Sequence, residues 1–163
     1  MKGKNIKVII ANLKKVFIGK KSNKMNSFDK IMQNNREWSA RKLSEDQNYF
    51  KRHSESQSPK YLWIGCSDSR IPAETILGLE PGEIFVHRNV ANQVSLSDIN
   101  AMSVIQFAVE VLKVEDIIVT GHYGCGGIRA AFQKNDFGPL EGWLSHIRNT
   151  RIDFRHLLNK SQE

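Results

Sequence analysis

The sequence predicts an α/β protein built around a parallel β-sheet. Three short apolar runs, YLWIGC (61–66), EIFVHRNV (83–90) and DIIVTG (116–121), alternate with helical patterns. Such alternation indicates strand–helix–strand units, whose strands run parallel. YLWIGC is continuously apolar, as is typical of a strand buried on both faces, whereas EIFVHRNV is mostly apolar and DIIVTG is expected to be a third, buried strand. A chain of 163 residues is long enough for one such domain with a sizeable core.

The segment ahead of the first strand predicts a helix over residues 27–56. Ser27 is a residue type that can cap a helix, and the apolar residues after it recur with a broken helical period. These apolar residues are Phe28, Ile31, Met32, Trp38, Leu43 and Phe50. The loop SESQSP, residues 54–59, follows and is closed by Pro59.

The segments between and after the strands predict further helices. The stretch IPAETILGLEPG (71–82) has a proline at a helix-entry position and ends in a Pro-Gly turn. Ser97 and Asp98 open a long helical pattern over 98–114, which is apolar on nearly every side and is therefore expected to pack against the sheet. A glycine-rich turn, HYGCGG, follows the third strand. The remaining helical pieces are expected at 128–134, 139–148 and 151–158.

The basic character of the chain comes from its first residues. The net charge is +7, but residues 1–24 hold eight lysines and no acidic residue, so the rest of the chain carries −1. A near-neutral body argues against nucleic-acid binding. The sequence has no run of 18 apolar residues, so no membrane span is expected.

The basic tail, residues 1–24, fits poorly with targeting segments. Lys14 and Lys15 interrupt its apolar middle and no small-residue cleavage site follows, so it makes a poor secretory signal. It also lacks arginine, which makes it a weak transit peptide. Two interpretations stay open: a non-native or mis-assigned start, with Met25 as the true first residue, and a basic helix at a membrane surface.

The chain has two cysteines, Cys66 and Cys125. A disulfide between them is possible by count, but a small secreted disulfide scaffold normally carries more cysteines. In a cytoplasmic setting, which we expect here, two distant cysteines near histidines and acids more often indicate a metal or catalytic site. Either cysteine alone is also compatible with a buried apolar role.

Polar side chains follow two of the predicted strands at the point where each strand ends. Cys66 and Asp68 follow the first strand, and His122 and Cys125 follow the third. Ligand sites of parallel sheets lie beyond the carboxyl ends of the strands, so these side chains are expected to meet. Two thiolates and one imidazole, with one position left open, describe a catalytic zinc site. The alternative is a reduced cysteine pair beside a core histidine, with no metal.

Three motifs of the sequence resemble the β-class carbonic anhydrases. They are CSDSR (66–70), FVHRNVAN (85–92) and GHYGCGG (121–127). The resemblance runs from about residue 27 to about residue 158. It implies an α/β fold with parallel strands in the order 2-1-3, later strands missing or shortened, flanking helices and an N-terminal helical arm.

The resemblance also implies reversible hydration of carbon dioxide to bicarbonate and a proton, through attack of zinc-bound hydroxide. Cys66, His122 and Cys125 would bind Zn²⁺. Asp68 and Arg70 would form a catalytic pair beside the metal, in which Asp68 accepts a hydrogen bond from the hydroxide while Arg70 holds it off the zinc. If that pair opened, Asp68 would become the fourth metal ligand and close the site.

Three further residues match positions that have roles in the family. Gln57 matches a glutamine that orients the substrate across a dimer interface, so the resemblance implies a homodimer or homotetramer. Trp63 and Arg88 match two residues of a pocket in which bicarbonate favours the closed form in one subgroup. Simpler interpretations are core packing for Trp63, an interface role for Arg88 and a solvent-facing loop position for Gln57.

The sequence departs from the family pattern at both ends. The basic tail of residues 1–24 precedes the pattern, and residues 25–163 are expected to form a single α/β zinc domain that lacks the family's C-terminal portion. Losing later strands would expose an apolar sheet edge. Three alternatives to the hydration of carbon dioxide stay open: an inactive, truncated zinc-binding domain, a hydrolase of carbon disulfide or carbonyl sulfide that uses the same ligands, and a metal-free thiol protein that uses Cys66 and Cys125.

Overall fold

The computed structural model describes residues 26–160. They form two compact units, one ending at Gln47 and the other beginning at Asn48. The first unit contains the helix α1 (Ser27–Glu45). The second contains, in chain order, α2 (Tyr49–Glu55), β1 (Tyr61–Cys66), α3 (Ala73–Leu77), β2 (Ile84–Asn89), η1 (Val90–Asn92), α4 (Ile99–Gln106), η2 (Phe107–Leu112), β3 (Asp116–Thr120), α5 (Gly126–Ala131), α6 (Leu140–Asp153) and α7 (Arg155–Lys160). The basic tail predicted at residues 1–24 lies outside the described residues.

The helix predicted over 27–56 is interrupted, so that prediction was wrong in part. Helix α1 ends at Glu45, its cap residue Asp46 is extended, and α2 begins only at Tyr49. Asp and Asn side chains compete for backbone hydrogen bonds and favour helix ends, which fits the interruption between Asp46 and Asn48. The N-cap of α1 is Asn26 rather than Ser27, because the Asn26 side chain accepts a hydrogen bond from the Asp29 amide at 2.9 Å.

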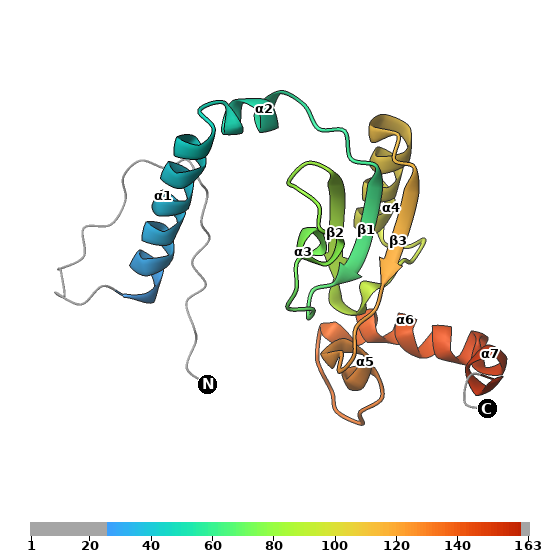
Figure 1. The fold of residues 1–163 in the computed structure, drawn as a ribbon. Coiled ribbons are helices and arrows are strands. Elements are labelled where there is room, and N and C mark those ends of the chain that lie inside the picture. The colour runs from blue at the N-terminus through green and yellow to red at the C-terminus, as the bar shows by residue number, and fades with distance from the viewer. Residues whose placement is uncertain (1–25, 161–163) are drawn as a thin grey trace. The chain divides into compact units, whose positions relative to one another are not determined.

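The three predicted strands form one parallel sheet in the order β2-β1-β3, as the sequence predicted. Trp63 of β1 is paired with Val86 of β2 on one side and with Ile118 of β3 on the other. All three strands run the same way, and Figure 1 shows their carboxyl ends pointing toward α5 and α6. The polar residues that follow β1 and β3 therefore arrive at the same end of the sheet.

Both faces of the central strand are covered, which confirms the α/β architecture. On one face, Leu62 and Ile64 are fully buried against Ala108 and its neighbours on the helical segment that runs through α4 and η2. On the other face, Trp63 packs with Ala73 of α3 and with Ile84 of β2. Burial of these side chains explains why YLWIGC is almost continuously apolar.

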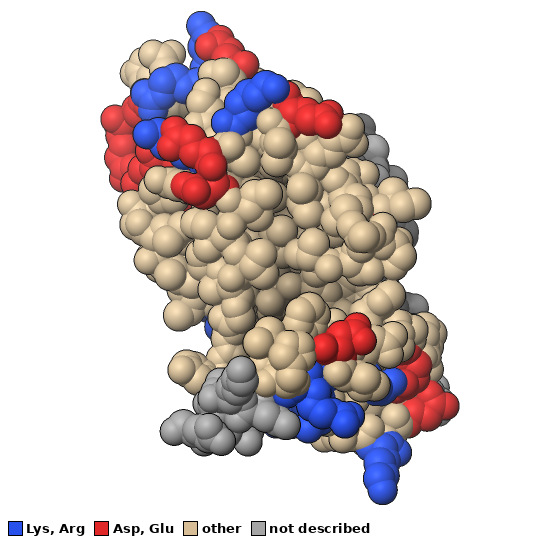
Figure 2. Space-filling model, turned by 90° about the vertical axis from the view of Figure 1, so that its right-hand side faces the viewer, with Lys and Arg blue, Asp and Glu red and all other residues tan. Residues whose placement is uncertain are grey.

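The third strand was predicted to be buried, and this prediction was wrong. Strand β3 lies at the edge of the sheet, with Ile117 44% and Val119 55% exposed. Figure 2 shows this side of the molecule, where a broad surface without charged side chains separates the charged groups at its two ends. An apolar run alone does not distinguish a central strand from an edge strand whose neighbour is absent.

The helix predicted over 98–114 begins where expected but differs in form and burial. Asp98 caps α4 through a hydrogen bond from the Asn100 amide at 3.0 Å. The helix widens into the π-helical segment η2, and Lys113 ends it in the left-handed conformation. Only one stripe faces the sheet, and Val109 and Val111 are 46% and 60% exposed.

The remaining helices were predicted with shifted boundaries. Helix α5 starts at Gly126, before the expected residue 128, and α6 continues to Asp153. The break expected after residue 148 lies at Phe154 instead. Among the helices of residues 26–160, none is both long and apolar enough to cross a membrane.

Candidate metal centre

Three predicted ligands meet at the carboxyl ends of β1 and β3. Cys66 is the last residue of β1, whereas His122 and Cys125 lie in the turn between β3 and α5. One ligand atom from each of these residues lies within 4.8 Å of the other two, and the two sulfurs are 3.6 Å apart. Both thiols are free. The structure thus brings together residues that are far apart in the sequence.

The imidazole of His122 is oriented for metal binding. Its Nδ1 lies 3.0 Å from the carbonyl oxygen of Tyr123, an acceptor that places the proton on Nδ1. Its Nε2 is buried and makes no hydrogen bond of standard geometry among the described residues, and the Cys66 sulfur is the neighbour with which this imidazole interacts. A histidine whose second nitrogen is fixed by a carbonyl, with its other nitrogen beside further ligand atoms, has the arrangement seen in metal-ligating histidines.

The sulfur of Cys66 is surrounded by donors. It accepts hydrogen bonds from the amides of Asp68 at 3.3 Å and Ala91 at 3.2 Å. Burial raises the pKa of this thiol, but the Asp68 amide, the His122 imidazole and the Ala91 amide together outweigh burial and bring the pKa to about 7. The thiolate, which is the form that binds metals, is therefore available near neutral pH.

The pKa values of the other two candidate ligands, Cys125 and His122, also depend on their neighbours. Burial, followed by the neighbouring Cys66 sulfur, raises the pKa of Cys125 despite the opposing amides of Ile128 and Gly127. The Cys66 sulfur also raises the pKa of His122. The protonation of Cys66 is thus linked to that of both His122 and Cys125, and a divalent cation bound by the three groups would replace protons on them.

The carboxylate of Asp68 lies outside this three-residue group. Its Oδ2 accepts a hydrogen bond from the Gly126 amide at 2.8 Å, and its Oδ1 lies 3.3 Å from Nη2 of Arg70. The Gly126 amide, and after it Arg70, lowers the pKa of Asp68. Both oxygens are therefore engaged by partners other than the ligand group.

Arg88 fixes the backbone that follows Cys66. Its guanidinium donates to the Cys66 carbonyl from Nε at 3.0 Å and from Nη2 at 2.6 Å, and Nη2 also donates to the Ser69 carbonyl at 2.6 Å. Trp63 lies on the same face of the sheet as Arg88, because the two residues are two register positions apart on paired strands. Trp63 is buried in the core with Ala73 and Ile84.

Gln57 is not brought to the metal group by its own chain. It is exposed in the loop between α2 and β1. It lines a separate hollow of about 500 Å³ together with His53, Pro81 and Gly82. Its predicted role across a dimer interface involves a second copy and is therefore not tested by a single chain.

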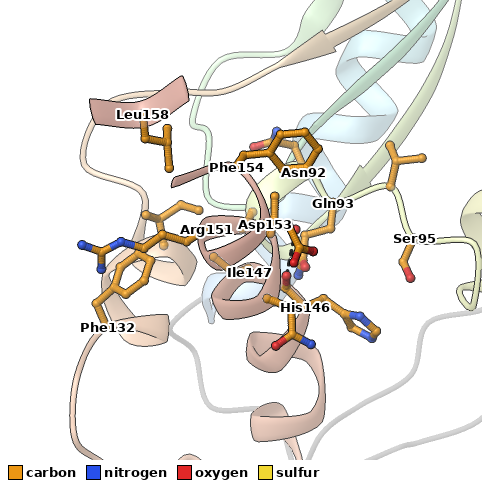
Figure 3. A pocket seen from close by; sticks show the side chains of 15 residues that line it. Asn92, Gln93, Ser95, Phe132, His146, Ile147, Arg151, Asp153, Phe154 and Leu158 are labelled. Carbon is orange, nitrogen blue, oxygen red and sulfur yellow. Dashed lines mark hydrogen bonds between the residues drawn. The ribbon is translucent and has the colours of Figure 1, made fainter. Parts of the chain in front are cut away.

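A larger cavity lies beyond the η1 turn. It has a volume of about 670 Å³ and is lined by η1 and the residues after it, together with residues of α5, α6 and α7. Figure 3 shows Asn92 and Gln93 on its wall beside His146 and Ile147 of α6. None of the three candidate ligands lines this cavity, so it is distinct from the metal centre.

The donor set fits zinc. Two thiolates and one imidazole are ligands that Zn²⁺ prefers, and three protein ligands leave one tetrahedral position for a water or substrate. The buried Nε2 of His122 supports this fit, because it makes no hydrogen bond of standard geometry and lies beside the sulfurs that would share the metal with it.

Sequence reasoning missed the two backbone amides that shape the site. The Gly126 amide holds Asp68, and the Ala91 amide contacts the Cys66 sulfur. A β-carbon at Gly126 would lie 3.3 Å from Oδ2 of Asp68, so only glycine allows this approach without displacement. The glycine run after Cys125 was the one available signal, whereas nothing in VAN (90–92) indicates an amide directed at sulfur.

Comparison with known proteins identifies relatives of the chain. The family model described as carbonic anhydrase matches residues 61–163. A carbonic anhydrase of Emericella nidulans is 53% identical over 121 residues, which cover 74% of this chain and 53% of that protein. A carbonic anhydrase of Candida albicans is 50% identical over 112 residues, covering 68% of this chain and 40% of that protein. The chain thus spans about half the length of the curated relatives it matches.

Solved structures agree with the sequence relatives. Among them, one from a study of two tetrameric β-carbonic anhydrases of Sordaria macrospora superposes with a TM-score of 0.74 at 40% identity, covering 82% of this chain and 68% of that one. A β-carbonic anhydrase of Aspergillus fumigatus also gives a TM-score of 0.74, at 39% identity and with 83% and 65% coverage. By sequence, fold and the residues gathered at the ends of β1 and β3, the chain belongs to the β-class carbonic anhydrase family.

Proposed function

We propose that the chain catalyses the reversible hydration of carbon dioxide to bicarbonate and a proton, with zinc held by Cys66, His122 and Cys125. The observation that carries this proposal is the convergence of the three ligand atoms within 4.8 Å, with the Nε2 of His122 buried beside the sulfurs. The carbonic anhydrase names of the relatives support it. None of these relatives is named as a hydrolase of carbon disulfide or carbonyl sulfide, so that alternative is not favoured.

A zinc ion held by Cys66, His122 and Cys125 would lower the pKa of a coordinated water and so supply a hydroxide nucleophile near neutral pH. The protein's part is to hold Asp68 in a position to accept a hydrogen bond from that nucleophile. Because the Gly126 amide and Arg70 lower the pKa of Asp68, this carboxylate stays ionised and acts as an acceptor. The same two partners keep it in place, with Oδ2 on Gly126 and Oδ1 toward Arg70. The proton released by the reaction passes to solvent or buffer.

Asp68 has a second proposed role as a fourth metal ligand in a closed form of the site. The described arrangement favours the open form, because the group of mutually close ligand atoms consists of Cys66, His122 and Cys125 without Asp68. Closing would require Asp68 to leave Arg70 and the Gly126 amide. Bicarbonate bound near Trp63 and Arg88 is the proposed trigger, and it would compete with the carbonyl oxygens that Arg88 now contacts.

We also propose that the active form is a homodimer or homotetramer in the cytoplasm. A structural relative from Sordaria macrospora is described as tetrameric. Gln57 lies away from the metal group in its own chain, which fits a residue that serves a neighbouring copy. The two free thiols fit a reducing compartment.

The direct test is stopped-flow measurement of carbon dioxide hydration by the full chain, with zinc content determined on the same sample. We expect one zinc ion per chain and measurable hydration near neutral pH. The variant Cys125→Ser should lose zinc and activity together, because a hydroxyl replaces a thiolate ligand. Full zinc occupancy without hydration in wild type would favour an inactive zinc-binding domain, and stoichiometric zinc in Cys125→Ser would overturn the ligand assignment.

A further inference from the structure

The short turn η1 has an unusual backbone. Ala91 has a φ of 66° and Asn92 a φ of 43°, so two consecutive residues other than glycine lie in the left-handed region. Residues with side chains rarely adopt this conformation, because the β-carbon meets the backbone. Such a conformation persists where the surrounding structure holds it, and it often marks a functional position.

The consequence of this turn is the direction of one amide. The Ala91 N–H donates to Sγ of Cys66 at 3.2 Å, across 25 residues of sequence. The sulfur is almost fully buried, so water does not compete for this contact. Outer hydrogen bonds to a ligand atom orient that atom and tune its binding of metal.

Helix α6 holds the turn from outside. The indole Nε1 of Trp143 donates to the Val90 carbonyl at 2.7 Å, and Nε2 of Gln93 donates back to the Trp143 carbonyl at 3.3 Å. A pair of hydrogen bonds also joins the two ends of the turn. The Asn89 side chain accepts a hydrogen bond from the Gln93 amide and donates one to the Gln93 carbonyl, both at 2.7 Å.

Side chains of α5 and α6 also pack against the turn. The methyl group of Ala91 is buried in a cluster with Ala131 of α5 and with Leu144 and Ile147 of α6. A β-carbon at Gly127 would lie 2.6 Å from Cγ1 of Val90, so the turn and the start of α5 approach each other closely. The turn therefore has little room to relax toward an ordinary conformation while α6 is in place.

We propose that Trp143 is a positioning residue for the metal centre: its hydrogen bond to the Val90 carbonyl keeps the left-handed turn that directs the Ala91 amide at the sulfur of Cys66. Among the described residues, the hydrogen bonds of Trp143 go to Val90 and Gln93 and not to a candidate ligand, so it acts through the turn. The inference rests on the proposed metal site. It gives α6 a role in that site, although α6 holds neither a candidate ligand nor a member of the Asp68–Arg70 pair.

The test uses cadmium NMR, because cadmium binds thiolate ligands and reports on each N–H that donates to a ligating sulfur. In the cadmium-loaded wild-type chain we expect a through-hydrogen-bond coupling between the metal and the Ala91 amide proton. Trp143→Phe keeps an aromatic ring but removes the indole donor, so this coupling should weaken or vanish and cadmium affinity should fall on the order of 10-fold. Arg148→Met is the matched control, because it removes a hydrogen bond from α6 to Ala131 of α5 and one within α6 to Glu141, and neither involves the turn.

A second measurement needs no metal. In the metal-free chain, hydrogen exchange at the Ala91 amide should be about fivefold faster in Trp143→Phe than in wild type, as expected for loss of one hydrogen bond that closes the turn. Asn89→Ala, which removes the two hydrogen bonds between Asn89 and Gln93, should have the same effect, and Arg148→Met should not. An intact metal–Ala91 coupling in Trp143→Phe, or no such coupling in cadmium-loaded wild type, would overturn the proposal. Neither measurement depends on carbon dioxide hydration. The proposal can therefore be tested even if the chain binds metal but is inactive.

Discussion

The carboxylate of Asp68 accepts a hydrogen bond from the backbone amide of Gly126 at 2.8 Å, so the start of α5 and the loop after β1 are joined beside the candidate ligands. The contact depends on the absence of a side chain at position 126. It is also the largest influence on the pKa of Asp68, ahead of the ion pair with Arg70. The carboxylate is therefore placed by backbone as much as by the arginine of its motif.

Replacing Gly126 by alanine should displace the Asp68 carboxylate. The added β-carbon would lie 3.3 Å from Oδ2, so the carboxylate must move by a few tenths of an ångström and its hydrogen bond weakens. We expect the pKa of Asp68 to rise toward its ordinary 3.8 and hydration activity to fall several-fold. Carboxyl-carbon NMR during an acid titration measures the first effect.

The sign of the pH effect follows from the lowered pKa of Asp68. An ionised Asp68 stabilises the fold above its ordinary pKa of 3.8, and this contribution is lost as the pH falls through the lower folded value. Gly126→Ala should make this contribution of Asp68 to stability smaller. Gly142→Ala is the matched control, because a β-carbon there meets no atom within 4 Å. An unchanged Asp68 titration in Gly126→Ala would contradict this account.

The two thiols should titrate separately in the metal-free protein. Cys66 should ionise at about 7, whereas Cys125 should ionise above the ordinary 9.0. Thiolate absorbance followed against pH should therefore show two transitions, and Cys66→Ser should remove the lower one. Because the folded pKa of Cys66 is lowered, its thiolate contributes stability above pH 9.0 that is lost as the pH falls through about 7. A single transition near 9.0 in wild type would show that the donors around Cys66 do not act as described.

Arg88→Met should destabilise the chain by about 2 kcal/mol and weaken metal binding. The variant keeps an unbranched apolar stem but leaves the carbonyls of Cys66 and Ser69 without their charged donor. Urea unfolding and zinc titration measure the two effects. If Arg88 instead acts only in bicarbonate binding, both values should match wild type while inhibition by bicarbonate is lost.

A charge on the edge strand should suppress self-association. Val119 of β3 is 55% exposed beside unpaired backbone groups, and a lysine there makes edge-to-edge pairing unfavourable. We expect Val119→Lys to lower the concentration dependence of sedimentation while changing the free energy of unfolding by less than about 0.5 kcal/mol. The buried neighbour Ile64 provides the contrast, because Ile64→Lys should prevent folding. If wild type and Val119→Lys sediment alike at every concentration, the edge does not drive association.

The sequence was sufficient for those parts of the molecule in which local pattern and tertiary position agree. Strand β1 was predicted to the residue because it is buried on both faces, and the meeting of the candidate ligands was predicted from where β1 and β3 end. The exposure of β3 could not be predicted, because an apolar strand has the same sequence pattern at the edge of a sheet as in its centre. The break after Glu45 depends on short-range competition by Asp46 and Asn48 that a periodicity count averages away.

The parts of the site that escaped prediction share a physical cause. The Gly126 and Ala91 amides act through backbone groups that every residue but proline carries, so residue identity does not reveal them. Trp143 was part of an expected helix, and its contact with Val90 depends on how α6 docks. Asp68 and Arg70 were found as a pair from their motif, but their geometry, with the carboxylate shared between an amide and a guanidinium, needed coordinates.

The indole of Trp63 also has a practical use. It lies over Gly65, where even a β-carbon would come within 2.5 Å of Nε1, and Gly65 directly precedes the ligand Cys66. A paramagnetic ion such as cobalt bound beside Cys66 would quench a fluorophore this near. The part of the tryptophan emission that comes from Trp63 should therefore fall as cobalt binds, which reports metal occupancy without labels and without turnover.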